Sequence, residues 1–467
     1  MNNDFYPEEE LKDSLSNFEK AVEYNENKYF ETYEFEYIID YYLSSNDILA
    51  SRNAIQKALT IHPKCHELQK RLAQLNNIEG FYEQAIHILN RSFQSFGTDK
   101  DADYYLILGE SYLGIGQIDK AKHVLEKAIQ LAGEEYFDIV TAVAILYQQE
   151  GYFEEVVFYL KQVEKEDPTF RLDIGISYYN LMDYELAITY LEQFIQTDSF
   201  SVDAWYYLAK SYQKNQQYTL AEEAFLNVIA LDSDTILYQY NLAKIYIDQA
   251  KYIDALSVYK DILSKDKDIN HSVFLSIGDV NYNINHYQNA KKNYEIALRL
   301  NPESAEAYHS LAQIEIEEEH YDIAKSYVQK AISIDAKQAP FFITLGTLNQ
   351  LLGDFQAAEF SFIEAINIDS TFELAWHSLI DYYFFLEKPL RAIDVAFDAK
   401  NKITETYILD CKIAAAYFDI KNEEYGLIYL QKAFVKDAQS KSFFLEYYPE
   451  GVSDYKIMDL IESVSIK

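Results

Sequence analysis

The sequence predicts an all-α solenoid of about twelve helix-turn-helix repeats. Glycine and proline are scarce, with 13 and 7 in 467 residues. Because these residues commonly bound strands and form tight β-turns, the composition disfavours a β-sheet protein. Apolar residues recur with the spacing of helices. Similar segments also recur at a constant interval, as shown by Ala290, Ala324 and Ala358, which are 34 residues apart. Together these observations favour stacked helical hairpins.

Twelve repeats are expected over residues 32–440. Within each one, apolar side chains fall at positions 4, 7, 8 and 11 and again at 17, 20, 24, 27 and 28, which predicts two helices joined by a turn. The predicted repeats start at residues 32, 66, 102, 136, 168, 202, 236, 271, 305, 339, 373 and 407.

Two columns of small residues explain how the paired helices could approach closely. Position 8 is Gly or Ala in nine of the twelve repeats, and position 20 is Ala in nine, with Ser51 and Gly426 adding two more small residues. Bulky residues at positions 4 and 17 then fill the space between helices. Gly426 lies inside a predicted helix, where glycine should cost about 1 kcal/mol relative to alanine.

The ends of the array need covering, because a terminal repeat has no neighbour on one side. Residues 1–31 form an acidic half-repeat, predicted as a lone capping helix, in which Leu11, Ser14, Phe18 and Ala21 match positions 17, 20, 24 and 27. Residues 441–467 are expected to form a short apolar helix, a turn and a final capping helix.

The pattern resembles the tetratricopeptide repeat (TPR) family, whose 34-residue signature combines aromatic, glycine and alanine positions. The resemblance implies a right-handed superhelix, with first helices lining a concave groove that binds peptides or partner helices. The best match is the repeat 271–304, which carries Phe274, Ile277, Gly278, Tyr287, Ala290, Tyr294, Ala297 and Pro302 in register.

One repeat departs from this pattern. The repeat from 136 is two residues short and has Glu155 and Gln162 where small or apolar residues are expected. If the superhelix bends or breaks, we expect it near residues 136–170.

Composition disfavours several functions. The formal charge of −36 repels nucleic-acid phosphates and anionic membrane surfaces, so we expect neither partner. The absence of a leader-like start or a long apolar stretch suggests a cytoplasmic protein, with Cys65 and Cys411 as reduced thiols.

No catalytic motif stands out, so we expect no enzyme activity and no cofactor. The turn HPKCH places His62, Cys65 and His66 together, but a structural zinc site needs about four ligands, so a polar turn is the better interpretation. The run EIEEEH at 315–320 is expected to be an exposed helix end rather than a calcium site.

A stripe of side chains in the repeats from 202 and 236 is the main candidate binding site. The resemblance implies that positions 2, 5, 9, 12 and 13 face the groove. Lys210 and Lys244 then occupy neighbouring places, and two like charges there would favour an anionic ligand. The candidate groove residues are Tyr206, Lys210, Lys214, Tyr240, Asn241 and Lys244, with the aromatic residues Tyr147, Tyr179 and Tyr282 at position 12 of other repeats.

One alternative to an anionic ligand stays open for this stripe. Lys244 could pair with Asp279 and Lys214 with Asp248, which would leave only Lys210 without a counter-charge. The carboxylate clamp known in the family is not supported, because only Asn241 matches its residue types.

The sequence therefore predicts a non-catalytic scaffold that binds a peptide or helix of a partner protein, whose identity it does not give. The alternative is a structural protein that self-associates through its ends or convex surface, as a possible homo-oligomer.

Overall fold

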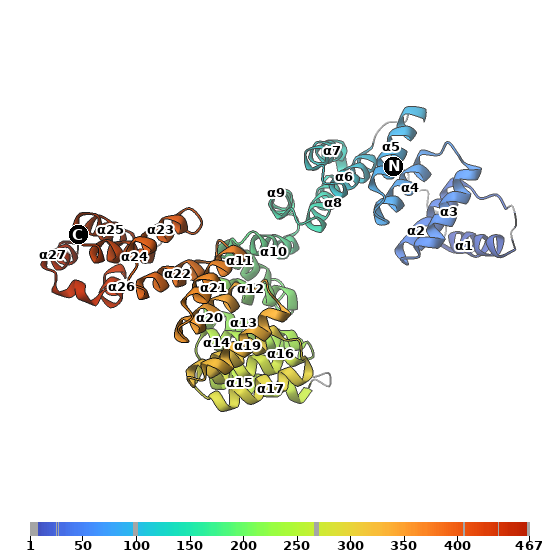
Figure 1. Ribbon diagram of the computed structural model, residues 1–467. Helices are drawn as coiled ribbons and strands as arrows, with labels where there is room; N and C mark the ends of the chain where they lie inside the picture. Colours follow the sequence, from blue (N-terminus) through green and yellow to red (C-terminus); the bar gives the residue numbers. More distant parts are fainter. Residues whose placement is uncertain are drawn as a thin grey trace. The chain divides into compact units, whose positions relative to one another are not determined.

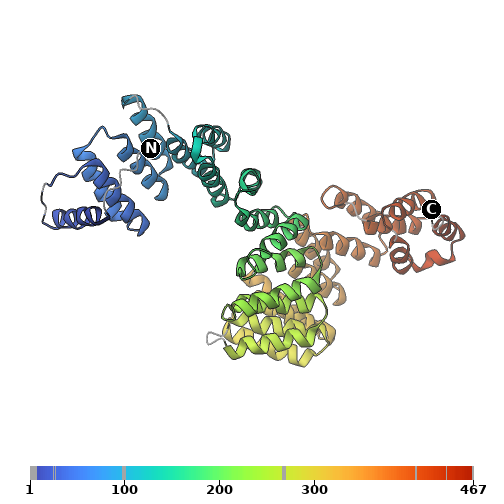
Figure 2. The ribbon, with the colours of Figure 1, turned by 180° about the vertical axis from the view of Figure 1, so that it is seen from behind.

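The computed structural model describes residues 8–24, 26, 28–96, 101–265, 270–404, 407–437 and 439–464. These residues form 27 α-helices and three short 3-10 helices, and no strand occurs among them (Figures 1 and 2). The chain divides into two compact units, Met1–Ile245 and Tyr246–Lys467. Each unit is built of antiparallel helical hairpins, as a helical repeat solenoid requires.

Each predicted repeat contributes two consecutive helices. The first helices are α2 (Thr32–Ser44), α4 (His66–Ile78), α6 (Ala102–Gly114), α8 (Tyr136–Gln149), α10 (Arg171–Asn180), α12 (Val202–Lys214), α14 (Ile236–Asp248), α16 (His271–Asn283), α18 (Ala305–Glu317), α20 (Ala339–Leu351), α22 (Glu373–Phe385) and α24 (Tyr407–Asp419). The second helices are α3 (Ile48–Ile61), α5 (Tyr82–Phe96), α7 (Ile118–Leu131), α9 (Phe153–Val163), α11 (Tyr184–Ile195), α13 (Tyr218–Leu231), α15 (Tyr252–Lys265), α17 (Tyr287–Leu300), α19 (Tyr321–Ile334), α21 (Phe355–Ile368), α23 (Pro389–Lys400) and α25 (Glu423–Lys436).

The first helices begin where the sequence pattern places the repeat starts, with one exception. Residue 168 opens the 3-10 helix η2 (Pro168–Phe170), and α10 follows three residues later at Arg171. Another 3-10 helix, η1 (Gly133–Glu135), precedes α8. Both short turns flank the repeat that the sequence marks as irregular. Whether the array bends there stays a prediction.

The two helices of a repeat are held together by a small residue at position 8 and a bulky one at position 24. A Cβ atom placed on Gly278 would lie 2.3 Å from the Tyr294 ring, and one on Gly346 would lie 2.6 Å from the Phe362 ring. Both rings are almost fully buried. The glycines therefore provide the recess into which the facing side chain fits.

The backbone conformation of the turn inside each hairpin defines the register of the repeat. In eleven of the twelve repeats, position 15 has a positive φ, for example Asn285 at 58° and Gly353 at 80°. In the repeat from 136 the positive φ falls instead on Gly151, at position 16. The register expected for that repeat was therefore wrong by one residue, although α8 itself begins at Tyr136.

Shifting the register removes the anomalies of this repeat. With position 1 at residue 137, position 8 becomes Ala144 and position 20 becomes Val156, both buried. Glu155 and Gln162 move to positions that need no small or apolar residue. The shortening then falls between α9 and α10, where η2 replaces helical residues.

Both ends of the array are covered by additional helices. At the start, α1 (Glu8–Glu23) buries Phe18 and Ala21 against Phe30, which precedes the first repeat, and against Phe35 of α2. Ser14 Oγ donates to Glu34 at 2.6 Å. The side chain of Leu11 lies outside the described residues. The division of the chain into a capping segment, repeats and a second cap stays a proposal.

At the other end, α26 (Ser440–Tyr447), η3 (Pro449–Ser453) and α27 (Tyr455–Val464) follow the last repeat. They pack Phe444 and Ile457 into a buried cluster with Phe418 and Leu430 of α24 and α25. These two caps use the same kind of apolar contact as the repeats themselves.

Gly426, which the sequence marks as weakening its helix, also lies at a close contact between helices. A Cβ atom at this position would lie 2.6 Å from the Phe418 ring, and that ring is fixed by Phe444 and Tyr448. We expect this close packing to outweigh the helix preference of alanine at this site.

We therefore expect Gly426→Ala to lower the free energy of unfolding by about 1–3 kcal/mol, because the added methyl group overpacks the site. Urea unfolding followed by circular dichroism would measure the change. Combining it with Phe418→Leu, which frees space for the methyl group, should recover part of the loss. A Gly426→Ala variant more stable than the wild type would show that helix preference dominates.

Candidate functional site

Lys210 lies on α12 among positive charges. It is half-buried, and burial together with the charges of Lys214 and Lys244 lowers the pKa of its ammonium group. Among the described residues of the first unit, no ion pair is formed by Lys210, Lys214 or Lys244. A partly desolvated cation beside two others is unfavourable unless an anion approaches.

An aromatic wall lies beside this lysine. The Tyr179 ring contacts Tyr207 at 5.5 Å, Tyr207 contacts Tyr206 at 5.4 Å, and Tyr206 contacts Tyr238 at 5.5 Å, measured between ring centroids. These four tyrosines come from α10, α12 and α14 and are half-buried. They offer ring surface that a partner side chain could cover.

The remaining residues of the predicted stripe are found on the same helices. Asn241 Nδ2 donates to the Leu237 carbonyl at 2.9 Å. The Asn241 side chain also interacts with Tyr206. Tyr240 is half-buried, while Lys214 and Lys244 are exposed. The structure thus brings Tyr206, Lys210 and Asn241 together with the two outer lysines, and their role in binding stays a proposal.

The two suggested acidic partners belong to the second unit. Asp279 accepts a hydrogen bond from the Tyr294 hydroxyl at 2.8 Å, and burial raises the pKa of its carboxyl group. Pairing of Lys244 with Asp279, or of Lys214 with Asp248, stays a prediction.

Tyr147 does not belong to an exposed groove. Its side chain has no exposed surface, and the Tyr159 ring stacks on it at 5.7 Å with an interplanar angle of 10°. The register shift explains the difference, because Tyr147 is at position 11, which faces the core, and not at position 12. Its inclusion among the groove candidates is therefore corrected.

Other aromatic residues at position 12 differ in their surroundings. Tyr282 is half-buried beside Tyr287, and its hydroxyl donates to Glu317 Oε1 at 3.4 Å. Phe384 contacts Tyr447 of α26 at 5.5 Å, and Phe418 is buried under the same cap. The C-terminal cap thus occupies these last two positions.

The histidines of the HPKCH turn have separate partners. His62 Nε2 lies 2.8 Å from the Phe30 carbonyl oxygen, and His66 Nδ1 lies 2.9 Å from Ser92 Oγ. Cys65 is a free thiol. Both imidazoles thus form hydrogen bonds within the fold, to different partners.

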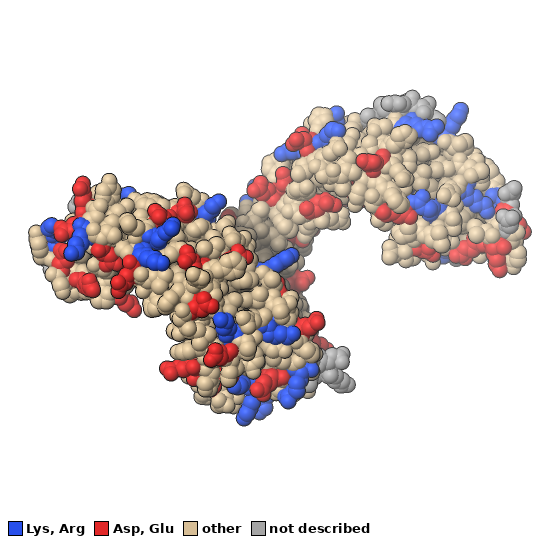
Figure 3. All heavy atoms as spheres, in the orientation of Figure 1, with Lys and Arg blue, Asp and Glu red and all other residues tan. Residues whose placement is uncertain are grey.

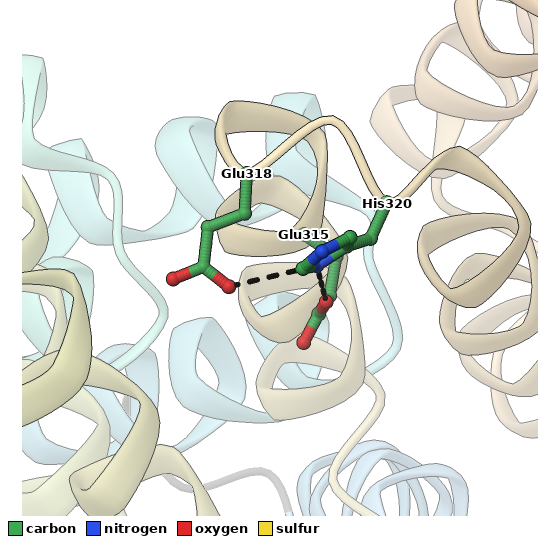
Figure 4. Close-up of side chains that lie close together, drawn as sticks. All are labelled: Glu315, Glu318 and His320. Carbon is green, nitrogen blue, oxygen red and sulfur yellow. Dashed lines mark hydrogen bonds and ion pairs between the residues drawn. The ribbon is translucent and has the colours of Figure 1, made fainter.

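Glu315 corrects the expectation that the run 315–320 is simply an exposed helix end. Its side chain is only 2% exposed, and it forms an ion pair with Lys291 Nζ at 2.5 Å. Figure 4 shows His320 between Glu315 and Glu318, with its Nδ1 3.0 Å from a Glu315 oxygen. Among the described residues, this is the one group of three side chains that are close enough together to bind one metal ion. The Lys291 ammonium, however, already pairs with the Glu315 carboxylate.

A cavity of about 490 Å³ opens between α2, α4, α6 and α8, in residues that sequence reasoning did not select. Its lining includes Asp40, Arg71, Asp103, Glu110 and Ile145. In the corrected register these residues occupy positions 9, 6, 2, 9 and 9 of four successive repeats. Charged residues at positions 2, 6 and 9 of successive repeats were the feature of the sequence that could have indicated this cavity.

Charge is spread over one visible face of the molecule. On the face shown in Figure 3, acidic and basic side chains are interspersed, without one large patch of either sign. None of the described helices has the length and apolar character needed to cross a membrane. The candidate sites are therefore described by local clusters of residues.

Family models agree with the repeat pattern. The model described as "Tetratricopeptide repeat" matches residues 102–135, 271–304 and 305–338, which have the bounds of three predicted repeats. The model described as "Anaphase-promoting complex, cyclosome, subunit 3" matches residues 180–262.

Individual relatives are distant. The chain is 29% identical over 102 residues to the general transcriptional corepressor trfA of Dictyostelium discoideum, a match that covers 22% of this chain and 7% of that protein. Among solved structures, it resembles the APC/C hetero-tetramer Cut9-Hcn1 with 13% identity and a TM-score of 0.41, covering 98% of this chain and 93% of that one. Yeast Tom70 gives 16% identity and a TM-score of 0.41, covering 80% and 94%. Likenesses this low do not indicate a partner.

The charge state of Lys210 gives a stability prediction. Since the pKa of Lys210 is lower in the folded than in the unfolded chain, folding disfavours its proton. That destabilisation is fully present at neutral pH and is relieved as the pH rises from the folded-state pKa through the higher pKa of the unfolded chain. We expect Lys210→Met to leave the free energy of unfolding unchanged or raise it by up to about 1 kcal/mol.

A paired lysine in the same unit provides the control. Lys70 Nζ lies 2.6 Å from Asp101 and 3.0 Å from Glu67, so Lys70→Met should cost about 2 kcal/mol in urea unfolding. If Lys210→Met is as destabilising as Lys70→Met, Lys210 has a partner in the free protein.

The buried Glu315 gives a second prediction. Burial alone would raise the pKa of Glu315, but the contacts with Lys291 and His320 lower it overall. Its stabilising contribution is therefore present above the ordinary pKa of glutamate and is lost as the pH falls through the lower folded-state value. Lys291→Met should cost about 3 kcal/mol at pH 8, because it removes the lysine partner of a buried carboxylate.

This cost should shrink between pH 8 and 5.5, since Glu315 becomes easier to protonate once Lys291 is gone. Urea unfolding at several pH values measures both effects, with the exposed Lys330→Met on α19 as control. A pH-independent difference between Lys291→Met and the wild type would contradict the ion pair's role.

Proposed function

Because the chain is a multi-repeat tetratricopeptide-repeat protein, we propose that it is a non-catalytic scaffold that binds an acidic segment of a partner protein. The proposed site lies on α10, α12 and the part of α14 before residue 246. The observation that carries the proposal is the group of three neighbouring lysines, without an ion pair among the described residues of the first unit, beside a wall of tyrosine rings.

Charge is the first part of the argument. Lys210 is partly desolvated and is repelled by Lys214 and Lys244. A carboxylate brought by a partner would reverse that balance, because it would attract all three ammonium groups at once. Two or more acidic residues spaced along an extended or helical segment could reach the inner lysine and the outer pair.

The tyrosines add a second kind of contact. Aromatic side chains bury a large area with few rotatable bonds, which makes them favoured anchors in binding surfaces. Tyr206 is one helical turn before Lys210 on α12, and its ring contacts Tyr207 and Tyr238. We therefore expect apolar or aromatic residues beside the acidic residues of the partner segment.

The overall charge of −36 limits which acidic segments can bind. At physiological ionic strength the Debye length is about 8 Å, so distant carboxylates are largely screened while the lysines act at contact distance. An acidic segment would thus gain attraction only in this site. The proposed selectivity is local and should weaken as salt concentration increases.

Charge reversal at the site tests the proposal. We expect Lys210→Glu/Lys244→Glu to reduce recovery of the main partner at least tenfold when tagged protein is purified from its native cells and partners are quantified by mass spectrometry. The matched control, Lys122→Glu/Lys127→Glu on α7, makes the same change of charge outside the site. It should retain the partner.

Two results would redirect the account. If the site variant keeps every partner that the wild type and the control keep, the lysines are not the binding site. If no partner is recovered and the mass measured by light scattering increases with protein concentration, self-association through the ends or convex surface replaces the proposal.

A further inference from the structure

The cavity between α2, α4, α6 and α8 has charges different from those of the lysine site. It lies in the first unit and is formed by the first helices of four successive repeats. Its volume of about 490 Å³ falls in the range of roughly 300–1,000 Å³ that is usual for ligand pockets. One side chain of a partner, with neighbouring apolar groups, is a reasonable occupant for a space of this size.

The two cations of the lining already have acidic partners. Lys70 Nζ contacts Asp101 at 2.6 Å and Glu67 at 3.0 Å, and its side chain is only 4% exposed. Arg71 Nη2 contacts Asp40 at 2.8 Å. An anionic ligand would have to compete with these carboxylates, so the cavity is poorly suited to a phosphate or an acidic peptide.

Two carboxyl groups of the lining lack a cation. Within the described residues, neither Asp103 nor Glu110 forms an ion pair. Glu110 is half-buried, and its Oε2 accepts a hydrogen bond from Asn77 Nδ2 at 2.9 Å. Burial, together with the charge of Glu150, raises the pKa of Glu110, and the Asn77 hydrogen bond offsets this only in part. The Glu110 carboxylate is already partly desolvated in the fold. A positive charge placed beside it would therefore be stabilised.

Apolar side chains complete the wall. Leu106 and Ile107 come from α6, and Ala142, Ile145 and Leu146 come from α8. Ile145 is 47% exposed, so it offers surface that the fold itself does not cover. The aliphatic stems of lysine and arginine pack well on such surface while their charged ends reach a carboxylate.

We propose that this cavity binds a lysine or arginine side chain of a partner protein, flanked by branched apolar residues. Asp103 and Glu110 neutralise the cation, and Leu106 and Ile145 contact its stem and the neighbouring apolar side chain. The inference rests on the proposed function only in treating the chain as a scaffold for protein partners. It concerns different residues and the opposite ligand charge.

A random 12-residue peptide library displayed on phage tests this site directly. The library is selected on the full chain and, in parallel, on Asp103→Asn/Glu110→Gln, which keeps the side-chain shapes and leaves an amide oxygen at position 110 to accept from Asn77. We expect the peptides that bind only the wild type to be enriched in Lys or Arg beside Leu, Ile or Val. Equal recovery of the same peptides on both proteins, or no enrichment of basic residues, would overturn the proposal.

The strongest peptide is then measured by fluorescence anisotropy with matched variants. Replacing its basic residue by Gln, or the cavity carboxyls by amides, should weaken binding at least tenfold. The control Asp119→Asn/Glu126→Gln on α7 removes the same charge elsewhere and should leave the affinity within twofold. Far-UV circular dichroism confirms that all variants are folded.

Two further outcomes separate this site from the lysine site. Lys210→Glu should leave the basic peptide's affinity unchanged, so failure of the proposed function and failure of this inference give different results. Preferential selection of acidic peptides that lose affinity on Arg71→Met would show that the cavity binds anions, which would contradict the inference.

Discussion

The close contact between a small residue at position 8 and a bulky one at position 24 is the constraint on which the rest of the structure depends. The Cβ atom missing from Gly278 leaves the space that the Tyr294 ring fills, and Gly346 does the same for Phe362. This contact sets how near the two helices of a repeat lie and fixes the rotation of the first helix. Because positions 4, 7, 8 and 11 of the first helix face the core, positions 5, 6 and 9 face away from it and can bind a ligand or partner.

Charged residues inside the fold are mostly paired, which makes the lysine site distinctive. Asp410 has no exposed side-chain surface and lies 2.7 Å from both Lys400 and Lys436. Lys412 is 5% exposed and lies 2.6 Å from Asp381. Desolvated charges generally need such partners. Lys210 shares the desolvation but has lysines as its charged neighbours, and Glu110 in the cavity is its acidic counterpart.

The sequence predicts the helices well because their determinants are local and repeated. Columns of small and aromatic residues fix the repeat interval, and nearly all first helices begin where that interval places them. The slip in the repeat from 136 has a physical cause. Its first helix carries one additional residue before the turn at Gly151, and apolar residues on all sides of α8 leave the alternative registers hard to distinguish.

The candidate sites are harder to predict because they depend on contacts between repeats. Column positions place Lys210 near Lys244, which agrees with their electrostatic interaction. They do not reveal that Lys291 reaches Glu315 of the next repeat, or that the C-terminal cap covers Phe384 and Phe418. The sequence also does not predict the cavity, because none of its lining residues is unusual by itself. They form a site only where four helices bring them together.

Site-specific photo-crosslinking in the native cell tests the central claim most directly, namely that Lys210 faces an acidic partner segment. A photoreactive phenylalanine analogue would replace Tyr206, and mass spectrometry would identify the crosslinked peptide. The account predicts one partner segment rich in Asp or Glu, whose crosslink is lost when Lys210→Glu is added and kept when Lys122→Glu is added. A crosslinked segment without acidic residues, or one recovered equally with Lys210→Glu, would contradict it.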